Sequence, residues 1–417
     1  MLMNSWIHVD SNSDFSIYNI PFGVYSMNAG KPRCASAIGK FIIDLHELQV
    51  LGYFDNLDLP ADIFKQSYLN DFIALGNAKT NHVRSRLIEL LDDANPILKN
   101  RSDIHYRIFI PREKVQLLMP VKVPNYTDFY SSKYHAENVG KMFRDPDNAL
   151  LPNWKYIPVG YHGRASSIVV GGVDFHRPKG QIKPADGPPI FGPSRKLDIE
   201  IEMAFVVNSN SNLGDSISIE NAKDNIFGLM IFNDWSARDI QKWEYVPLGP
   251  FLGKNFASSV SPWIVTLAAL EPFKVPLPEQ EPATLSYLEE KNRHSYDIHL
   301  KAFIENDNFK AHKITSTNYK YMYWTMAQQL AHHTVNGCNI EVGDLYASGT
   351  ISGPEPGSYG SLLEITWGGK NEIKLPDGSK RTFLEDGDRV IIKGYAEKEG
   401  IRVGFGEVRA MVLPSII

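Results

Sequence analysis

In the first part of the chain, hydrophobic residues recur with a helical spacing. Leu87, Leu90 and Leu91 lie three and four residues apart, which places them on one face and predicts an amphipathic helix within residues 62–93. Short apolar strings lie on either side of this stretch. Because the pattern changes near residue 120, we predict that residues 1–119 form a small separate domain.

The second part of the chain, residues 120–417, has the pattern of a mostly β domain. Short strand-like runs such as 168–172 and 389–394 are separated by glycine and proline. Helical patterns are few, and the best of them lie at 132–144 and 321–335. The sequence therefore predicts a mainly β protein with some helix.

Acidic and apolar residues alternate in LDIEIEMAFVV, residues 197–207. A period of two is typical of a strand and places Asp198, Glu200 and Glu202 on one face. Adjacent carboxylates repel each other and raise each other's pKa unless a cation neutralises them or water screens them. A solvated strand edge is one interpretation. The strand continues directly into the apolar run 203–207, however, which favours a buried strand and hence a cation.

Two further acids stand next to apolar sequence. Asp128 lies in NYTDFY, and Asp234 closely follows the hydrophobic run 226–232. An acid after a hydrophobic strand is often a helix N-cap, and this role stays an alternative for Asp234. Four oxygen donors without cysteine would suit a hard cation, Mg²⁺ or Ca²⁺, rather than zinc. Spacing alone does not assemble these acids into one site.

Composition and charge narrow the class of protein. The 43 basic and 48 acidic residues give a formal charge of -5, which provides no electrostatic footprint for nucleic acid or for an anionic membrane. No apolar run reaches the roughly 18 residues that a membrane span needs. Cys34 and Cys338 match neither a disulfide framework nor a zinc spacing. We predict a cytoplasmic protein in which both cysteines are buried packing residues.

Several strings in the second part resemble motifs of the fumarylacetoacetate hydrolase family. They are YTDFYSSKYHA (126–136), YHGRASS (161–167), FGP (191–193), NDWSARDIQ (233–241) and TISGPEP (350–356). The resemblance covers nearly the whole chain, because SDF (13–15) and PFGVY (21–25) resemble the N-terminal domain that shorter relatives lack. It implies a small N-terminal SH3-like β-barrel, followed by a larger mixed β-roll around a metal.

Carried over residue by residue, the resemblance implies a metal site and a catalytic pair. The residues that would bind the divalent metal are Asp128, Glu200, Glu202 and Asp234. His135 would be the general base, and Glu364 would be its carboxylate partner. Such a partner fixes the imidazole tautomer and stabilises its protonated form, which suits a base near neutral pH. A packing or surface role is the alternative for His135, since the chain has 12 histidines.

The same resemblance implies charge-stabilising and substrate-binding residues. Those that would stabilise charge on the reacting carbonyl are Arg238, Gln241 and Lys254. Those that would contact the substrate are Tyr130, Arg144, Tyr161, Gln241, Tyr245 and Thr350. Each has an alternative, namely a surface contact for the cations and ordinary packing for the tyrosines. As a set they suit a diketo diacid, whose carboxylates and developing oxyanion all need donors.

The activity implied by the resemblance is metal-dependent hydrolysis of the carbon–carbon bond of 4-fumarylacetoacetate to fumarate and acetoacetate, the last step of tyrosine and phenylalanine catabolism. The resemblance also implies a homodimer. One alternative is another reaction on an oxo acid, by a decarboxylase, hydratase or isomerase of the same superfamily. The other is a non-catalytic, metal-stabilised scaffold. The presence of both His135 and Glu364, together with the N-terminal domain, favours hydrolysis.

One short segment departs from the family pattern. Animal members of the family carry Gly-Thr where this chain has Ala257 and Ser258. Serine can replace threonine as a hydroxyl donor, whereas alanine adopts a backbone with positive φ only at a cost. We therefore expect either that the glycine is not required by the backbone conformation or that the loop differs here.

Overall fold

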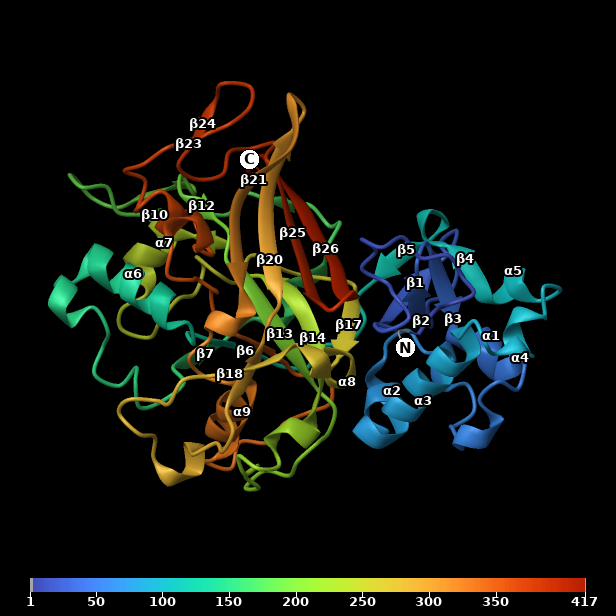
Figure 1. Cartoon of the computed structure of the whole chain (residues 1–417). Helices are drawn as coiled ribbons and strands as arrows, with labels where there is room; N and C mark the ends of the chain where they lie inside the picture. Colours follow the sequence, from blue (N-terminus) through green and yellow to red (C-terminus); the bar gives the residue numbers. More distant parts are fainter. Residues whose placement is uncertain (1–2, 417) are drawn as a thin grey trace.

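An antiparallel sheet with flanking helices forms the N-terminal part of the computed structural model, which describes residues 3–416 (Figure 1). Its strands are β1 (Phe22–Ser26), β2 (Arg33–Ile38), β3 (Phe41–Asp44), β4 (Phe109–Pro111) and β5 (Gln116–Leu118). Its helices are α1 (Leu45–Val50), α2 (Asn70–Ile73), α3 (Gly76–Leu91), α4 (Pro96–Lys99) and α5 (His105–Ile108). The predicted amphipathic helix is α3, which buries Leu87, Leu90 and Leu91 and confirms that prediction.

The N-terminal strands are continuous with a large central sheet. Strand β1 pairs antiparallel with β17 (Trp263–Thr266), so that Gly23 lies opposite Trp263. A Cβ at Gly23 would lie 2.6 Å from Cε3 of the Trp263 ring, so only glycine allows this close approach. From β17 the sheet continues through β14 (Ile226–Asn233), β13 (Ile201–Val207), β22 (Leu345–Ala347), β6 (Tyr126–Phe129) and β7 (Gly160–His162). The pairing of β22 with β6 is parallel, so this sheet is mixed.

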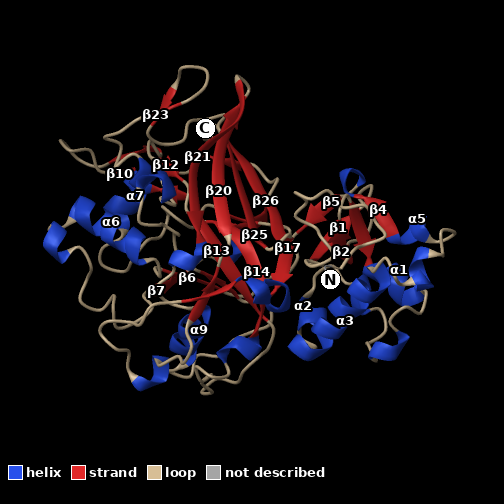
Figure 2. Cartoon of the chain, in the orientation of Figure 1, coloured by secondary structure: helices blue, strands red, loops and turns tan. Residues whose placement is uncertain are grey.

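A second sheet lies against the central sheet (Figure 2). Its strands, in spatial order, are β21 (Phe309–Asn318), β20 (His299–Asn306), β25 (Arg389–Lys398), β26 (Ile401–Leu413) and β9 (Phe175–His176). Apolar side chains of the two sheets, among them Ile231, Leu300 and Phe405, are fully buried in one core. At Gly394, in β25, a Cβ would lie 3.2 Å from Cδ1 of Ile231 in β14, which shows how closely the two sheets approach. This packing fixes the strand ends that carry the polar residues described below.

The helices of the second part are α6 (Lys133–Phe143), α7 (Arg238–Glu244), α8 (Leu267–Leu270), α9 (Met326–Thr334) and α10 (Leu362–Ile365). The helix predicted at 132–144 is α6, whose N-cap Ser132 accepts from the backbone N–H of His135. The helix predicted at 321–335 is shorter than predicted. It begins only after Thr325, because the Thr325 side chain and Gln328 form a capping box there.

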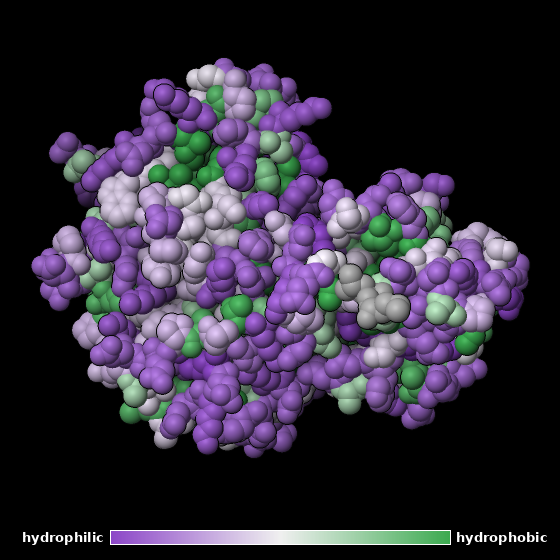
Figure 3. Space-filling model, viewed as in Figure 1, coloured by the Kyte–Doolittle hydropathy of each residue, from purple (hydrophilic) through white to green (hydrophobic). Residues whose placement is uncertain are grey.

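The predicted fold class, mainly β with some helix, is confirmed. The N-terminal part is rich in sheet, while its SH3-like closure and the division at residues 119 and 120 stay predictions. The face of the molecule in Figure 3 is mostly hydrophilic, with hydrophobic residues scattered over it. Within residues 3–416, no helix is both long and apolar enough to cross a membrane.

Candidate active site and metal centre

Four buried carboxylates meet where strands of the central sheet begin and end. Asp128 lies in β6 and Glu202 in β13, while Glu200 directly precedes β13 and Asp234 directly follows β14. Strands β13 and β14 pair antiparallel, which brings the start of one next to the end of the other. One oxygen of each carboxylate lies within 4.8 Å of the corresponding oxygen of every other. Tertiary pairing thus brings together the four acids predicted to be metal ligands.

The electrostatics of this acidic cluster fit a bound cation. Asp128 Oδ1 and Glu202 Oε1 are buried and have no hydrogen-bond partner among the described residues. Burial, and then the negative charge of the neighbouring acids, raises the pKa of Asp128 and of Glu202 well above the ordinary range. Two ionised carboxylates at such a separation repel each other by on the order of 3 kcal/mol at an effective dielectric constant of about 20. A hard divalent ion would remove this repulsion and satisfy both oxygens.

Two buried cations lie beside the cluster. Lys254 Nζ donates to Glu200 Oε2 at 2.5 Å and to Asp234 Oδ2 at 2.6 Å. Arg238 NH1 lies 2.7 Å from Glu200 Oε1. Burial alone would raise the pKa of Glu200, but the charges of Lys254 and Arg238 outweigh it and hold that pKa well below the ordinary value. The four carboxylates outnumber the two cations that contact them, and a divalent ion would supply further positive charge.

The alternating acidic segment is not one strand, so that prediction is wrong. Asp198 belongs to the short strand β12 (Leu197–Asp198), which pairs with β15 (Ser236–Ala237), and β13 starts only at Ile201. Between the two strands, Glu200 forms an isolated bridge with Ser361 from a distant part of the chain. The carboxylate of Asp198 consequently faces Arg238 rather than the cluster.

Both simpler interpretations of the acids are also excluded by the structure. Residues 197–207 are all buried, so the segment is not a solvated edge. Asp234 does not cap a helix, because α7 begins at Arg238 and has Ala237 at its N-cap position. A buried carboxylate that does not cap a helix needs a cation to compensate its charge.

A histidine and a glutamate form a buried pair close to the cluster. His135 lies in α6 and Glu364 in α10, and the distance from His135 Nδ1 to Glu364 Oε2 is 2.7 Å. Glu364 accepts further hydrogen bonds from three side chains, namely Asn138, Ser352 and Ser361. Burial raises the pKa of Glu364, but the charge of His135 and these donors outweigh it, so that the pKa lies below its ordinary value. An ionised Glu364 fixes the proton on Nδ1 and leaves Nε2 as the basic nitrogen of His135.

Two of the predicted substrate-binding tyrosines lie within this site. The ring of Tyr130 packs edge to face against His135, with 5.2 Å between ring centroids. The hydroxyl of Tyr161, in β7, lies 3.3 Å from Asp234 Oδ2. Burial, together with the charges of Asp128 and Asp234, raises the pKa of Tyr161 well above its ordinary value. Tyr161 is therefore a neutral hydroxyl donor at the edge of the cluster.

Gln241 and Thr350 are two more predicted residues at the site. Gln241 Oε1 accepts from Arg238 NH1 at 3.3 Å. Thr350 is buried, and its hydroxyl has no partner among the described residues. The NH2 group of Arg238 is buried and also lacks a partner within residues 3–416. Unpartnered buried donors are costly, so these two groups are suited to a ligand that is not part of the chain.

The remaining predicted residues lie farther out. Both Nε and NH2 of Arg144 donate to the carbonyl oxygen of Ala149, in the loop after α6. Tyr245 follows α7, and 52% of its surface is exposed. Neither side chain hydrogen-bonds to the acidic cluster or to the histidine–glutamate pair.

The structure adds contacts beyond the predicted site residues. Ser258 Oγ donates to Asp234 Oδ1 at 3.1 Å, so the serine is a hydroxyl donor here, as the sequence allowed. Asn138, Ser352 and Ser361 hold Glu364, and the sequence did not single them out. Ala257 is not among the described residues with positive φ, so the glycine of the family pattern is not required by the backbone here.

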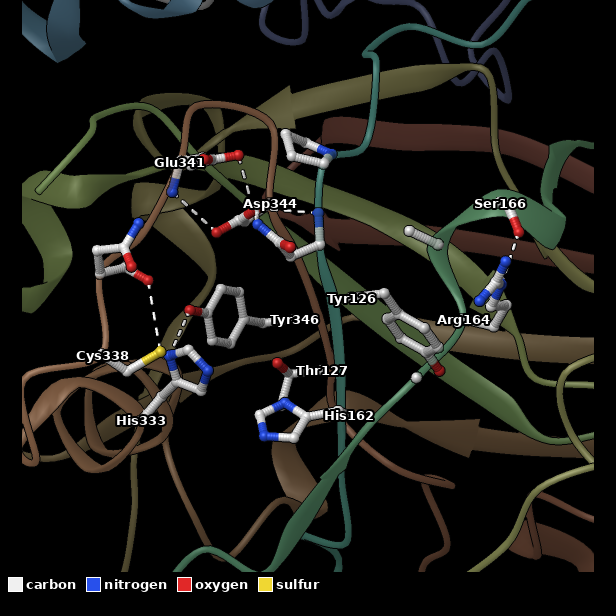
Figure 4. A pocket seen from close by; sticks show the side chains of 15 residues that line it. Tyr126, Thr127, His162, Arg164, Ser166, His333, Cys338, Glu341, Asp344 and Tyr346 are labelled. Carbon is white, nitrogen blue, oxygen red and sulfur yellow. Dashed lines mark hydrogen bonds between the residues drawn. The ribbon is translucent and has the colours of Figure 1, made fainter. Parts of the chain in front are cut away.

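Two cavities lie next to this region. One, of about 260 Å³, is lined by Tyr161, Asp234 and Lys254 and therefore opens on the acidic cluster. The larger, of about 620 Å³, is shown in Figure 4 and contains none of the four clustered acids. Cys338 lines the larger cavity and is only partly buried, so the prediction that both cysteines are buried is wrong for it. We place the chemistry beside the smaller cavity, because Asp234 of the acidic cluster and its partner Lys254 line it.

The fold and the site define an enzyme of mainly β structure whose centre combines a buried acid–base pair with a carboxylate cluster able to hold a metal ion. Residues 125–413 match the family model for the C-terminal part of fumarylacetoacetate (FAA) hydrolase, and residues 18–120 match the model for the N-terminal part of fumarylacetoacetase. The chain belongs to the fumarylacetoacetase family.

Curated relatives agree with this assignment, and a solved structure has a similar fold. The chain is 49% identical to a fumarylacetoacetase of Homo sapiens over 99% of both chains, and 50% identical to one of Caenorhabditis elegans over the full length of both. A fumarylacetoacetate hydrolase from psychrophilic Exiguobacterium antarcticum has a similar fold, with a TM-score of 0.52 and 18% identity over 95% of this chain and 99% of that chain.

Proposed function

We propose that this protein hydrolyses the carbon–carbon bond of 4-fumarylacetoacetate and releases fumarate and acetoacetate. The observation that carries the proposal is the buried His135–Glu364 pair beside four clustered carboxylates, in a chain of this family. Cleavage of such a bond requires a nucleophile for the ketone and stabilisation of a carbon leaving group. The two halves of the site supply these two requirements separately.

His135 is the proposed base. Its Nδ1 is held by the ionised Glu364, so Nε2 can accept a proton from water as that water attacks the carbonyl next to the fumaryl part. The same contact stabilises the imidazolium that forms. When the leaving carbon needs a proton, the imidazolium is a suitable donor, and this would return His135 to its neutral state.

Buried donors stabilise the oxyanion that the attack produces. The unpartnered NH2 of Arg238 is the strongest candidate, with the ammonium of Lys254 beside it. Gln241 contacts Arg238 and completes the proposed charge-stabilising set. Donors that are already fixed at the site need no reorganisation when charge develops, which is why such groups lower a barrier effectively.

Asp128, Glu200, Glu202 and Asp234 would hold a divalent ion, and we propose Mg²⁺ or Ca²⁺ because every donor is a carboxylate oxygen. Such an ion supplies Lewis-acid stabilisation of enolate-like charge on the acetoacetyl part. Tyr130, Tyr161 and Thr350 would contact the substrate from within the site, and Arg144 and Tyr245 from its outer side. The family resemblance supports a role in tyrosine and phenylalanine catabolism, a homodimer and a cytoplasmic location.

The test is an absorbance assay of fumarylacetoacetate cleavage by the purified chain, with and without a chelator, and with identification of the products. We expect fumarate and acetoacetate in equal amounts, and we expect chelation to stop the reaction and added Mg²⁺ or Ca²⁺ to restore it. Release of carbon dioxide, or an isomerised substrate without cleavage, would instead indicate another reaction of the superfamily. Unchanged cleavage after complete removal of divalent ions would exclude the metal from the mechanism.

The substitution Glu364→Gln tests the acid–base pair. Glutamine keeps the shape of the side chain but cannot balance the charge of a protonated His135. We expect kcat to fall by about 10²–10⁴-fold, with little change in KM, because a positioned base contributes on this scale and Glu364 makes no substrate contact in the proposal. The measurement is steady-state kinetics on both proteins. A raised KM with an unchanged kcat would show that Glu364 serves binding instead.

A further inference from the structure

One buried acid near the site has no role in the function proposed above. Asp198 is fully buried and bonds none of the four clustered acids, although it lies only two residues before Glu200. Its Oδ2 accepts from Arg238 Nε at 2.8 Å and from the backbone N–H of Leu363 at 3.0 Å. Its Oδ1 accepts from the backbone N–H of Leu362 at 2.7 Å. Asp198 thus contacts two parts of the proposed site, Arg238 and helix α10, which carries Glu364.

The first part is the guanidinium of Arg238. Arg238 Nε donates to Asp198, and Arg238 NH1 contacts Glu200 and Gln241. Within Arg238, only NH2 is left without a hydrogen-bond partner. A guanidinium held at two of its three nitrogens cannot rotate, and the third nitrogen then points in one direction. The Asp198 carboxylate is therefore what leaves NH2 as the one free and fixed donor.

The second part is the helix that carries Glu364. Leu362 and Leu363 are the first two residues of α10, and both of their N–H groups donate to Asp198. Glu364 follows in the same turn and bonds His135. A four-residue helix has no other turns to fix its position, so the Asp198 carboxylate ties the orientation of Glu364 to that of Arg238.

We infer that Asp198 is a positioning residue of the reaction, which sets the free donor of Arg238 and the carboxylate of Glu364 in one rigid frame. This inference rests on the proposed function, because it takes Arg238 to stabilise the oxyanion and Glu364 to support the base. Asp198 does not touch the substrate. It acts through the two groups that it holds, in the way that outer residues orient catalytic ones.

The test is a double-mutant cycle on the full chain with Asp198→Asn and Arg238→Lys. Asparagine has nearly the same shape, but its amide nitrogen cannot accept from Nε of Arg238 or from an N–H of α10. We expect Asp198→Asn to lower kcat by about 10- to 100-fold with little change in KM, since displacement of a catalytic group by about 1 Å can cost on the order of 10²-fold. In the Arg238→Lys background the same change should have a smaller effect, because one of the two groups that Asp198 positions is gone and only the contribution through Glu364 remains.

A matched control separates positioning from general stability. Asp388 is also fully buried and accepts from Arg381 Nε at 2.8 Å, from Arg381 NH2 at 3.0 Å and from the backbone N–H of Glu385. Asp388→Asn therefore removes the same kinds of contact outside the site. We expect both variants to lower the melting temperature, and only Asp198→Asn to lower kcat.

The outcomes distinguish the inference from the function on which it rests. If Arg238→Lys leaves kcat unchanged, the proposed role of Arg238 fails and the inference fails with it. If Arg238→Lys is slow but Asp198→Asn has the kcat of Asp388→Asn, the positioning role is overturned and the proposed function stands. If the two effects multiply fully, Asp198 does not act through Arg238, and the single frame that joins Arg238 to Glu364 is overturned. If Asp198→Asn does not fold, Asp198→Glu is used in the same cycle. That variant keeps the negative charge and displaces the guanidinium of Arg238. If its effect on kcat is smaller in the Arg238→Lys background, the inference is supported. If the two effects on kcat multiply fully, the inference is overturned.

Discussion

Replacement of His135 by alanine is expected to lower the rate of fumarylacetoacetate cleavage by about 10²–10⁴-fold, which is the contribution of a positioned general base. The fold and the metal site should remain. The imidazole bonds Glu364 and none of the four clustered acids, whose oxygens would hold the ion. Single-turnover cleavage and calorimetric titration with Mg²⁺ or Ca²⁺, made on the same preparation, measure the two properties separately.

A second histidine provides the control for this experiment. His333 lies in α9, and its Nδ1 is 2.8 Å from the hydroxyl of Tyr346, so it is a half-buried ring with a polar partner outside the proposed site. His333→Ala should leave kcat nearly unchanged. Normal cleavage by His135→Ala would remove this residue from the mechanism. Weakened metal binding, with activity restored by excess ion, would make His135 a ligand instead.

Replacement of Glu202 by glutamine is expected to abolish tight binding of the divalent ion, and with it most of the hydrolysis. The amide keeps an acceptor for the backbone N–H of Gly349, which Glu202 Oε2 contacts at 3.0 Å. It removes one negative charge and gives the ion a neutral ligand in place of a carboxylate. Losses of about 10–100-fold in metal affinity accompany changes even in outer contacts of metal sites, so loss of a direct ligand should cost at least that much.

The same variant should be more stable than the parent protein when no divalent ion is present. Burial and the neighbouring acids raise the pKa of Glu202, which means that its charge is unfavourable in the empty cluster. Added ion should then raise the melting temperature of the parent protein far more than that of Glu202→Gln. Asp344→Asn is the control, since Asp344 is a buried acid outside the cluster that accepts from Asn125. If the ion raised the melting temperature of the parent protein and of Glu202→Gln equally, Glu202 would be excluded as a ligand.

Local patterns in the sequence were sufficient for the elements that depend on neighbours along the chain. The spacing of Leu87, Leu90 and Leu91 predicted α3, and the helix at 132–144 is α6. The alternating acids also indicated buried charge, because the segment continues into apolar sequence. These predictions succeed because side-chain periodicity and capping act over a few residues.

The same pattern failed where a distant segment intervenes. Alternation predicted one strand with Asp198 beside Glu200 and Glu202, yet the chain breaks where Glu200 bridges Ser361. That break turns Asp198 toward Arg238 and away from the cluster. Alternation of side chains produces a continuous strand only where a neighbouring strand pairs along its whole length. The alternating segment itself does not indicate where the neighbouring strand ends.

The sequence by itself determined the kinds of residue at the site and, through its family resemblance, their identity. Only the tertiary structure decided that they meet. His135 and Glu364 are 229 residues apart, and Lys254 is 54 residues from Glu200. The four acids converge because β13 and β14 pair and because β22 holds β6 in the same sheet. The free energy of that pairing comes from burial of apolar side chains between the two sheets. The hydrophobic effect is not directional, so the local sequence does not indicate which distant segment an apolar side chain will contact.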